Sequence, residues 1–183
     1  MTEAADPLYF HRLVSALGPN EDGLSDAEVR ETEERFDFTF PPDLRALLQY
    51  CVPVAGQFPK WRGDPAELEK TLRRPGDELR FEVEYNGFWL EAWGPRPALT
   101  SAAVAFVDGL LHNAPKLIPV YGRRYLPSTP CEAGNPVFTL DGSNGSYAGF
   151  DLVAYFKHEF HVPFVEGNET SPRRIVFWSD LVQ

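Results

Sequence analysis

Proline and glycine divide this chain into short segments. Among its 183 residues are 17 prolines and 14 glycines, which end helices, stay out of central strands and form turns. The pairs Gly18-Pro19, Pro75-Gly76 and Gly94-Pro95 each predict a break. We therefore expect many short elements joined by turns, within the one domain that a chain of this length supports.

Four segments in the N-terminal part carry apolar residues at helical spacing behind a residue that can start a helix. Ser25 and Glu28 have the spacing of a capping box, with Leu24 as its hydrophobic staple. Asp64-Pro65 starts another helix, which Pro75-Gly76 is expected to stop. The predicted helices cover about residues 7–17 (capped by Asp6), 26–35, 42–51 and 66–72.

The hydrophobic period changes after Pro75-Gly76. Polar and apolar residues alternate from Arg80 to Tyr85, which predicts a half-buried strand. Asn86-Gly87 then predicts a hairpin turn, with Phe88–Trp93 as the return strand. Further predicted elements are a helix at about 100–113, strands at 117–121 and 137–140, a loop leading into 146–150, and a helix at 152–160 capped by Asp151. Residues 174–178 fit an edge strand or a docking segment.

Neither an internal repeat nor a linker divides the chain, so we expect a single domain over residues 1–183. Its predicted class is α+β, a mainly antiparallel central sheet with helices at the N-terminus and beside the strands. The longest apolar run, Ala102–Val107, is far shorter than the ~20 residues that cross a bilayer. Glu3 and Asp6 stand where a secretion signal would carry basic residues. The sequence therefore predicts a cytoplasmic protein without a membrane partner.

The negative charge is concentrated in one half of the chain. The formal net charge is −10, and residues 1–91 hold 19 acidic and 10 basic side chains. Such a half repels nucleic acid and favours encounter with a basic protein. The alternative is that these acids only keep the surface soluble. Nucleic acid is therefore not an expected partner.

Residues with catalytic or metal-binding chemistry are present without the patterns that such chemistry needs. Cys51 follows an apolar helical pattern and is expected in the core, and neither it nor Cys131 has a metal-type spacing. His158 and His161 are i, i+3 neighbours, whereas the zinc motif places two histidines at i, i+4. We predict no catalytic residue, no metal and no cofactor.

Two aromatic blocks leave alternatives open. Trp89 and Trp93 would lie on one face of a strand, either packing on the core or exposed as binding anchors. Arg123 and Arg124 precede Tyr125 and would either form internal salt bridges, for example to Glu132, or contact a ligand or partner.

The order of several segments resembles the SUKH superfamily, which includes fungal cell-wall regulators and bacterial immunity proteins. The first stretch is 23–36, GLSDAEVRETEERF, running into 40–48, FPPDLRALL. Residues 116–122, KLIPVYG, and 134–138, GNPVF, are similar to the central strands of the family, and 149–160 to its strand-to-helix close. The resemblance covers about residues 22–162, with 1–21 as an N-terminal helical extension and 163–183 as a tail.

The resemblance implies a non-catalytic protein-binding module. In bacteria this would be an immunity protein, or antitoxin, that neutralises a toxin, and the candidate partner here is a basic toxin domain. A housekeeping interaction scaffold is one alternative, and a small-ligand-binding protein or enzyme using the Trp/Arg-Tyr region is another. The candidate partner-binding residues are Glu28, Glu31, Glu34, Trp61, Glu82, Glu84, Trp89, Trp93, Arg123, Arg124 and Tyr125.

Overall fold

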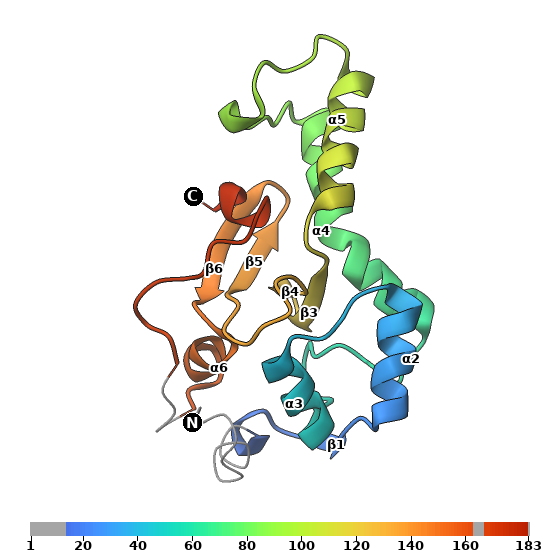
Figure 1. Ribbon diagram of the computed structural model, residues 1–183, viewed down its shortest axis with the longest axis vertical. Coiled ribbons are helices and arrows are strands. Elements are labelled where there is room, and N and C mark those ends of the chain that lie inside the picture. Colours follow the sequence, from blue (N-terminus) through green and yellow to red (C-terminus); the bar gives the residue numbers. More distant parts are fainter. Residues whose placement is uncertain (1–13, 163–166, 183) are drawn as a thin grey trace.

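A four-stranded antiparallel sheet separates two hydrophobic layers in the computed structural model, which describes residues 14–162 and 167–182 (Figure 1). Its strands follow chain order: β3 (Leu117–Tyr121), β4 (Arg124–Pro127), β5 (Val137–Asp141) and β6 (Asn144–Gly149). Successive residues point to opposite faces, so that Leu117 packs in one layer and Ile118 in the other. The expected α+β class with an antiparallel sheet is confirmed.

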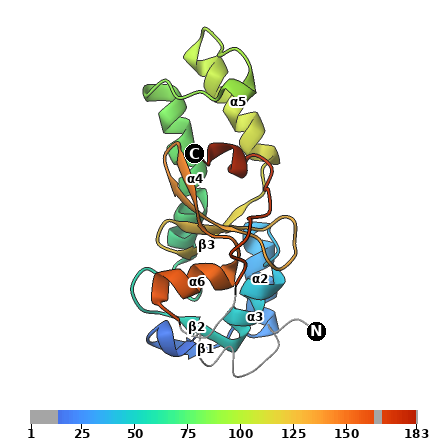
Figure 2. The ribbon, with the colours of Figure 1, turned by 90° about the vertical axis from the view of Figure 1, so that its left-hand side faces the viewer.

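The first layer lies under one face of the sheet and consists of α2 (Asp26–Phe36), α3 (Pro42–Tyr50) and α6 (Leu152–Phe160) (Figure 2). The predicted capping box begins α2: the backbone N–H of Glu28 donates to Ser25 Oγ, and the N–H of Ser25 donates to the Glu28 carboxylate. A two-stranded sheet of β1 (Asn20–Asp22) and β2 (Cys51–Pro53) adjoins this layer. Asp151 caps α6 as predicted, accepting from the N–H of Ala154.

The second layer covers the opposite face with two long helices and the C-terminal segment. They are α4 (Pro65–Tyr85) and α5 (Thr100–Asn113), joined by residues 86–99 with the short 3-10 helix η2 (Glu91–Trp93). The tail contributes Ile175, Phe177 and the 3-10 helix η3 (Trp178–Leu181). The two helices form a hairpin that extends beyond the sheet (Figure 1). The tip of this hairpin is therefore the part of the fold farthest from the first layer.

The prediction for residues 66–93 was wrong. Pro75-Gly76 does not stop a short helix, because α4 continues through Pro75 for 21 residues in all. Arg80–Tyr85 is its last part and not a strand, and Phe88–Trp93 is a loop with one 3-10 turn and not a return strand. The buried residues Leu79 and Val83 are four apart, as on one face of a helix. Packing of that face against the sheet stabilises the helix more than the alternation of polar and apolar residues favours a strand.

Two smaller differences lie at the sheet and the tail. The strand β4 was not predicted, and it pairs with both β3 and β5. Residues 174–177 are not in a strand, but Ile175 and Phe177 are buried against the second layer. Of the two alternatives for the tail, the docking segment is therefore the one observed.

Most of the predicted first helix, about residues 7–17, lies outside the described residues. In its described part, residues 14–16 are helical. Within residues 14–162 and 167–182, none of the helices combines the length and hydropathy that crossing a bilayer requires.

Candidate interaction surface

Backbone hydrogen bonds fix the loop at the hairpin tip onto the end of α4. Gly87 has a positive φ of 70°, which lets the chain turn, and the N–H of Phe88 donates to the Glu82 carbonyl. The Arg96 guanidinium donates to the Val83 carbonyl. Carbonyls in the last turn of a helix otherwise lack partners. The loop is thus held in place and can present side chains in a defined arrangement.

Aromatic rings from three segments contact one another along this loop. Trp89 contacts Phe106 of α5 with ring centroids 5.3 Å apart, and contacts Trp93 at the same distance. Trp93 in turn stacks on Phe177 of the tail at 6.3 Å. The Trp89 indole N–H is satisfied by the Gly94 carbonyl at 2.7 Å. The loop, α5 and the tail are thereby joined.

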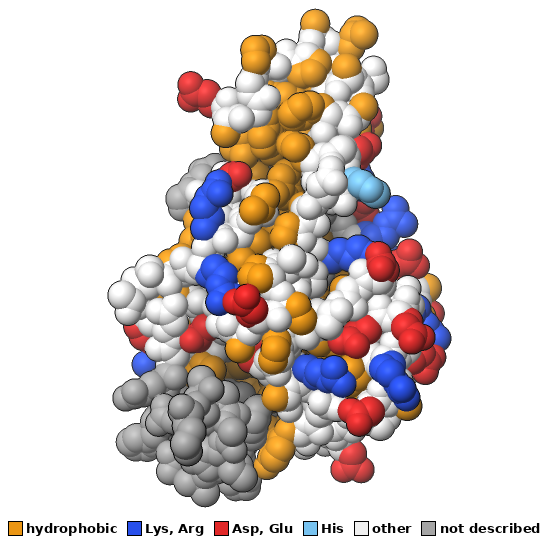
Figure 3. Space-filling view, viewed as in Figure 1, with side chains coloured by type: hydrophobic (Ala, Val, Ile, Leu, Met, Phe, Trp, Pro, Cys, Tyr) orange, Lys and Arg blue, Asp and Glu red, His pale blue; other side chains and the backbone are white. Residues whose placement is uncertain are grey.

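Large apolar side chains of the same three segments remain exposed. Leu99 is 70% exposed, Phe106 40% and Val176 69%, while Trp89 and Trp93 are half-buried. We call these five residues the aromatic face. Figure 3 shows hydrophobic side chains gathering over α5 from the hairpin tip toward the middle of the molecule. Soluble monomers rarely leave apolar patches of this kind open unless they bind something.

A second exposed aromatic pair lies on α4. Phe81 is 53% exposed and Tyr85 66%, and as i, i+4 neighbours their rings lie 4.8 Å apart. They point away from the face of α4 that carries the buried Leu79 and Val83. Both helices of the hairpin therefore offer apolar surface.

Unpaired carboxylates accompany the hairpin. Glu84 on α4 and Glu91 in η2 are exposed, and neither forms an ion pair with a described residue. Glu82, also on α4, accepts a hydrogen bond from the Asn86 side chain at 2.9 Å. The apolar surface therefore has a negatively charged border.

The acids predicted on α2 are mostly neutralised. Glu28 is paired with Arg62, whose Nε lies 2.6 Å from its carboxylate. Hydrogen bonds from Arg62 and Ser25 lower the pKa of Glu28 to about 2. Glu31 is paired with Arg35 at 2.7 Å. Of the three predicted acids, only Glu34 has no ion pair within the part of the chain that the structure describes.

The predicted aromatic anchors differ in exposure. Tyr125 is 1% exposed and packs in the second layer, so it is not offered to a partner. Burial raises the pKa of its hydroxyl. Trp61 is half-buried and packs edge-on against Phe40 at 5.2 Å. Only Trp89 and Trp93 belong to the exposed face.

The two adjacent arginines, Arg123 and Arg124, make internal ion pairs, which is one of the two alternatives expected from the sequence. The Arg123 guanidinium donates to Glu78 of α4, at 2.7 Å from Nη2, and to Asp141 of β5. Arg124 lies 3.6 Å from Glu159 of α6. The partner suggested from the sequence, Glu132, is instead paired with Arg173 at 3.2 Å. These contacts tie the sheet to α4 and α6. Trp89 and Trp93 instead contact α5 and the tail.

Residues with catalytic or metal-binding chemistry do not converge. His158 contacts Glu169 at 3.0 Å, and no group of three or more potential ligands that could hold a metal occurs among residues 14–162 and 167–182. Cys51 is 4% exposed, and burial raises the pKa of its thiol to about 11. Its expected place in the core is confirmed. The other thiol, Cys131, is exposed.

The candidate residues drawn from the sequence do not include the exposed apolar positions of the hairpin, Leu99, Phe106, Phe81 and Tyr85, or Val176 of the tail. Leu99 and Phe106 are seven apart, a spacing that places two residues on one face of a helix. That spacing was the available signal, but it does not distinguish a buried face from an open one.

Comparison of the chain with protein-family models, with curated proteins and with solved structures gives no match.

Proposed function

We propose that this protein is a non-catalytic protein-binding module that docks its partner on the aromatic face. The observation that carries the proposal is the exposure of Leu99, Phe106 and Val176 on the three segments that the Trp89–Trp93 pair belongs to or contacts, which are the loop, α5 and the tail. Large aromatic and aliphatic side chains on a rigid surface supply binding energy at low entropic cost. The loop is already anchored to α4, so little ordering is required on binding.

The charge around this surface favours a basic partner. Glu84 and Glu91 border the hairpin without an ion pair to any described residue, and the whole chain carries −10. Long-range attraction of this sign speeds association and weakens as salt is added. Of the acids predicted to contact a partner, Glu28 and Glu31 are ion-paired within the protein. Glu34 and Glu84, together with Glu91, are the acids that steer association in this proposal.

The specific role we propose is that of a cytoplasmic immunity protein of SUKH type, which neutralises a basic toxin domain. All five resembling stretches supply buried residues to the first layer: Leu24, Val29, Phe40, Leu44, Leu47, Leu48, Ile118, Val120, Val137, Leu152, Tyr155 and Phe156. The α4–α5 hairpin lies between the second and third of these stretches. A shared scaffold with a variable hairpin would let related proteins bind different partners.

Affinity capture with paired variants tests the docking surface. Leu99→Lys places a charge on the aromatic face, and Val54→Lys places the same charge at a 46% exposed valine beyond β2. Both variants should melt as the wild type does, because both positions are exposed. We expect Leu99→Lys to lose the captured partner and Val54→Lys to retain it. Equal retention by both variants would contradict docking on this face.

Co-expression tests the immunity role. If the captured partner is toxic to a host cell, the wild-type protein and Val54→Lys should protect the cell, and Leu99→Lys should not. A partner that binds on the aromatic face but harms no cell would support the housekeeping scaffold instead. Association measured over increasing salt should slow steeply, and a rate independent of ionic strength would exclude electrostatic steering.

A further inference from the structure

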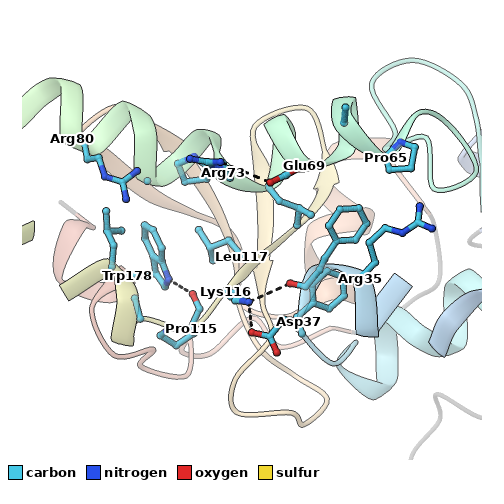
Figure 4. A pocket seen from close by; sticks show the side chains of 18 residues that line it. Arg35, Asp37, Pro65, Glu69, Arg73, Arg80, Pro115, Lys116, Leu117 and Trp178 are labelled. Carbon is cyan, nitrogen blue, oxygen red and sulfur yellow. Dashed lines mark hydrogen bonds and ion pairs between the residues drawn. The ribbon is translucent and has the colours of Figure 1, made fainter. Parts of the chain in front are cut away.

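A pocket of about 620 Å³, whose lining shares no residue with the aromatic face, lies between the first layer and the hairpin. One wall is α4, and the others are the end of α2, the segment from α5 into β3, and η3 (Figure 4). Its interior is apolar, with Phe36, Leu72, Leu111, Leu117 and Trp178 among the lining side chains. The Trp178 indole is held in place by a 2.7 Å hydrogen bond to the Pro115 carbonyl. Pockets of this volume and character hold small molecules.

The lining of the pocket is basic in an acidic protein. Four cations line it, Arg35, Arg73, Arg80 and Lys116, against the two carboxylates of Asp37 and Glu69. Three of the cations are already hydrogen-bonded to acids: Arg35 to Glu31, Arg80 to Asp77 and Asp108, and Lys116 to Asp37.

Arg73 is the cation with donors to spare. Its nearest acid, Glu69, lies 3.8 Å away, which is an ion pair but too long for a hydrogen bond. Its guanidinium makes no hydrogen bond to any residue that the structure describes. In Figure 4 it lies on α4 between Glu69 and Arg80, at the wall of the pocket.

Gly76 lines the pocket together with Arg73. It lies inside α4, where glycine is disfavoured relative to alanine, and it does not have a positive φ. A Cβ there would lie 3.6 Å from Leu111 Cδ1, which is an ordinary contact. Backbone conformation and close packing therefore do not require glycine at this position. A larger side chain at this position would extend past Leu111 into the pocket that both residues line.

We propose that this pocket binds a small amphipathic anion, with an apolar chain or ring in the interior and a carboxylate held by Arg73. The guanidinium supplies two parallel N–H donors to the carboxylate, as arginine does in bidentate pairs. Phe36, Leu111 and Trp178 cover the apolar part. This site is separate from the aromatic face, so its test does not depend on the protein partner.

Decanoate, with decan-1-ol as its uncharged counterpart, serves as the probe. The readout is the NMR shift of the tryptophan indole N–H groups, because Trp178 lines the pocket whereas Trp89 and Trp93 lie on the aromatic face. We expect decanoate to shift the Trp178 signal saturably and leave the Trp89 and Trp93 signals unchanged. Decan-1-ol should bind about tenfold more weakly, the difference typical of one charge-assisted contact.

Two variants and two matched controls complete the experiment. Arg73→Gln should lower decanoate affinity about tenfold and leave that of decan-1-ol unchanged. Gly76→Leu should fill the pocket and abolish binding of both. Arg30→Gln, at an exposed arginine of α2 outside the pocket, and Gly109→Leu, at a glycine of α5 with open space around it, should bind as the wild type does. A thermal melt of each variant confirms that it is folded.

Three results would overturn the proposal. They are the absence of a saturable Trp178 shift at millimolar decanoate, equal affinities for decanoate and decan-1-ol, and retention of binding by a folded Gly76→Leu protein.

Discussion

Replacing Leu79 by alanine, with Phe81→Ala as its counterpart, tests the helical structure of α4. In a strand, residues 79, 81, 83 and 85 would share one face, and truncating either side chain would have a similar cost. In the helix, Leu79 is 0% exposed and Phe81 is 53% exposed. The two substitutions should therefore differ sharply.

The expected costs follow from burial. Leu79→Ala removes three buried carbons, worth about 2.4 kcal/mol of transfer free energy. The cavity left behind raises the loss of unfolding free energy to about 3–4 kcal/mol. For a chain of this length the melting temperature should fall by roughly 6–16 °C. Phe81→Ala mainly loses its contact with Tyr85, an i, i+4 pair worth about 0.2–0.5 kcal/mol.

Urea denaturation followed by circular dichroism measures both variants. The wild type, Leu79→Ala and Phe81→Ala should unfold with similar denaturant slopes and with midpoints that separate only for Leu79→Ala. A Phe81→Ala protein as destabilised as Leu79→Ala would refute the assignment of residues 80–85 to a helix.

Three further predictions concern charge, thiols and close packing. Glu28→Gln keeps the capping hydrogen bond but removes the charge. Because folding lowers the pKa of Glu28 to about 2, the wild type should be more stable than this variant above pH 4.5. The difference should be less than about 1 kcal/mol, since the Glu28–Arg62 pair is exposed. That advantage should vanish as the pH falls from 4.5 to 2, and a difference persisting at pH 2 would contradict it. A thiol reagent should label Cys131 in the native protein and Cys51 only after unfolding, whereas rapid labelling of both would be inconsistent with a buried Cys51. Gly149→Ala should cost roughly 2–3 kcal/mol, because its Cβ would lie 2.4 Å from the Tyr155 nitrogen; a melting temperature equal to that of the wild type would argue against this packing.

Elements with local start and stop signals were predictable from the sequence. The capping box at Ser25 and Glu28, Pro42 at the first position of α3 and Asp151 before α6 each act through hydrogen bonds or φ preferences within a few residues. The strands β3 and β5 are apolar runs bounded by glycine or proline. For these segments, local preference and tertiary packing agree.

The long helix α4 was not predictable in this way, because two local signals conflicted with the packing. Proline lacks an N–H and usually interrupts a helix, yet α4 continues past Pro75. The alternation of residues 80–85 also hides a helical face, since Leu79 and Val83 are four apart. Only the sheet against which they pack reveals that this face is the buried one.

The proposed interaction surface overlaps the candidate partner-binding residues at Trp89 and Trp93. Glu28 was also among these candidates, because its ion-pair partner Arg62 lies 34 residues further along the chain. Such distant ion pairs leave no local signal. The burial of Tyr125 also leaves no local signal, because its neighbours in the core come from another part of the sequence.

Hydrogen–deuterium exchange on the complex with the captured partner tests the proposed docking surface most directly. Docking on the aromatic face should slow exchange of the backbone amides in residues 86–106 and around Val176, while the amides of α2 and α3 exchange as in the free protein. Slowed exchange in α2 and α3, with residues 86–106 unchanged, would contradict the proposed surface.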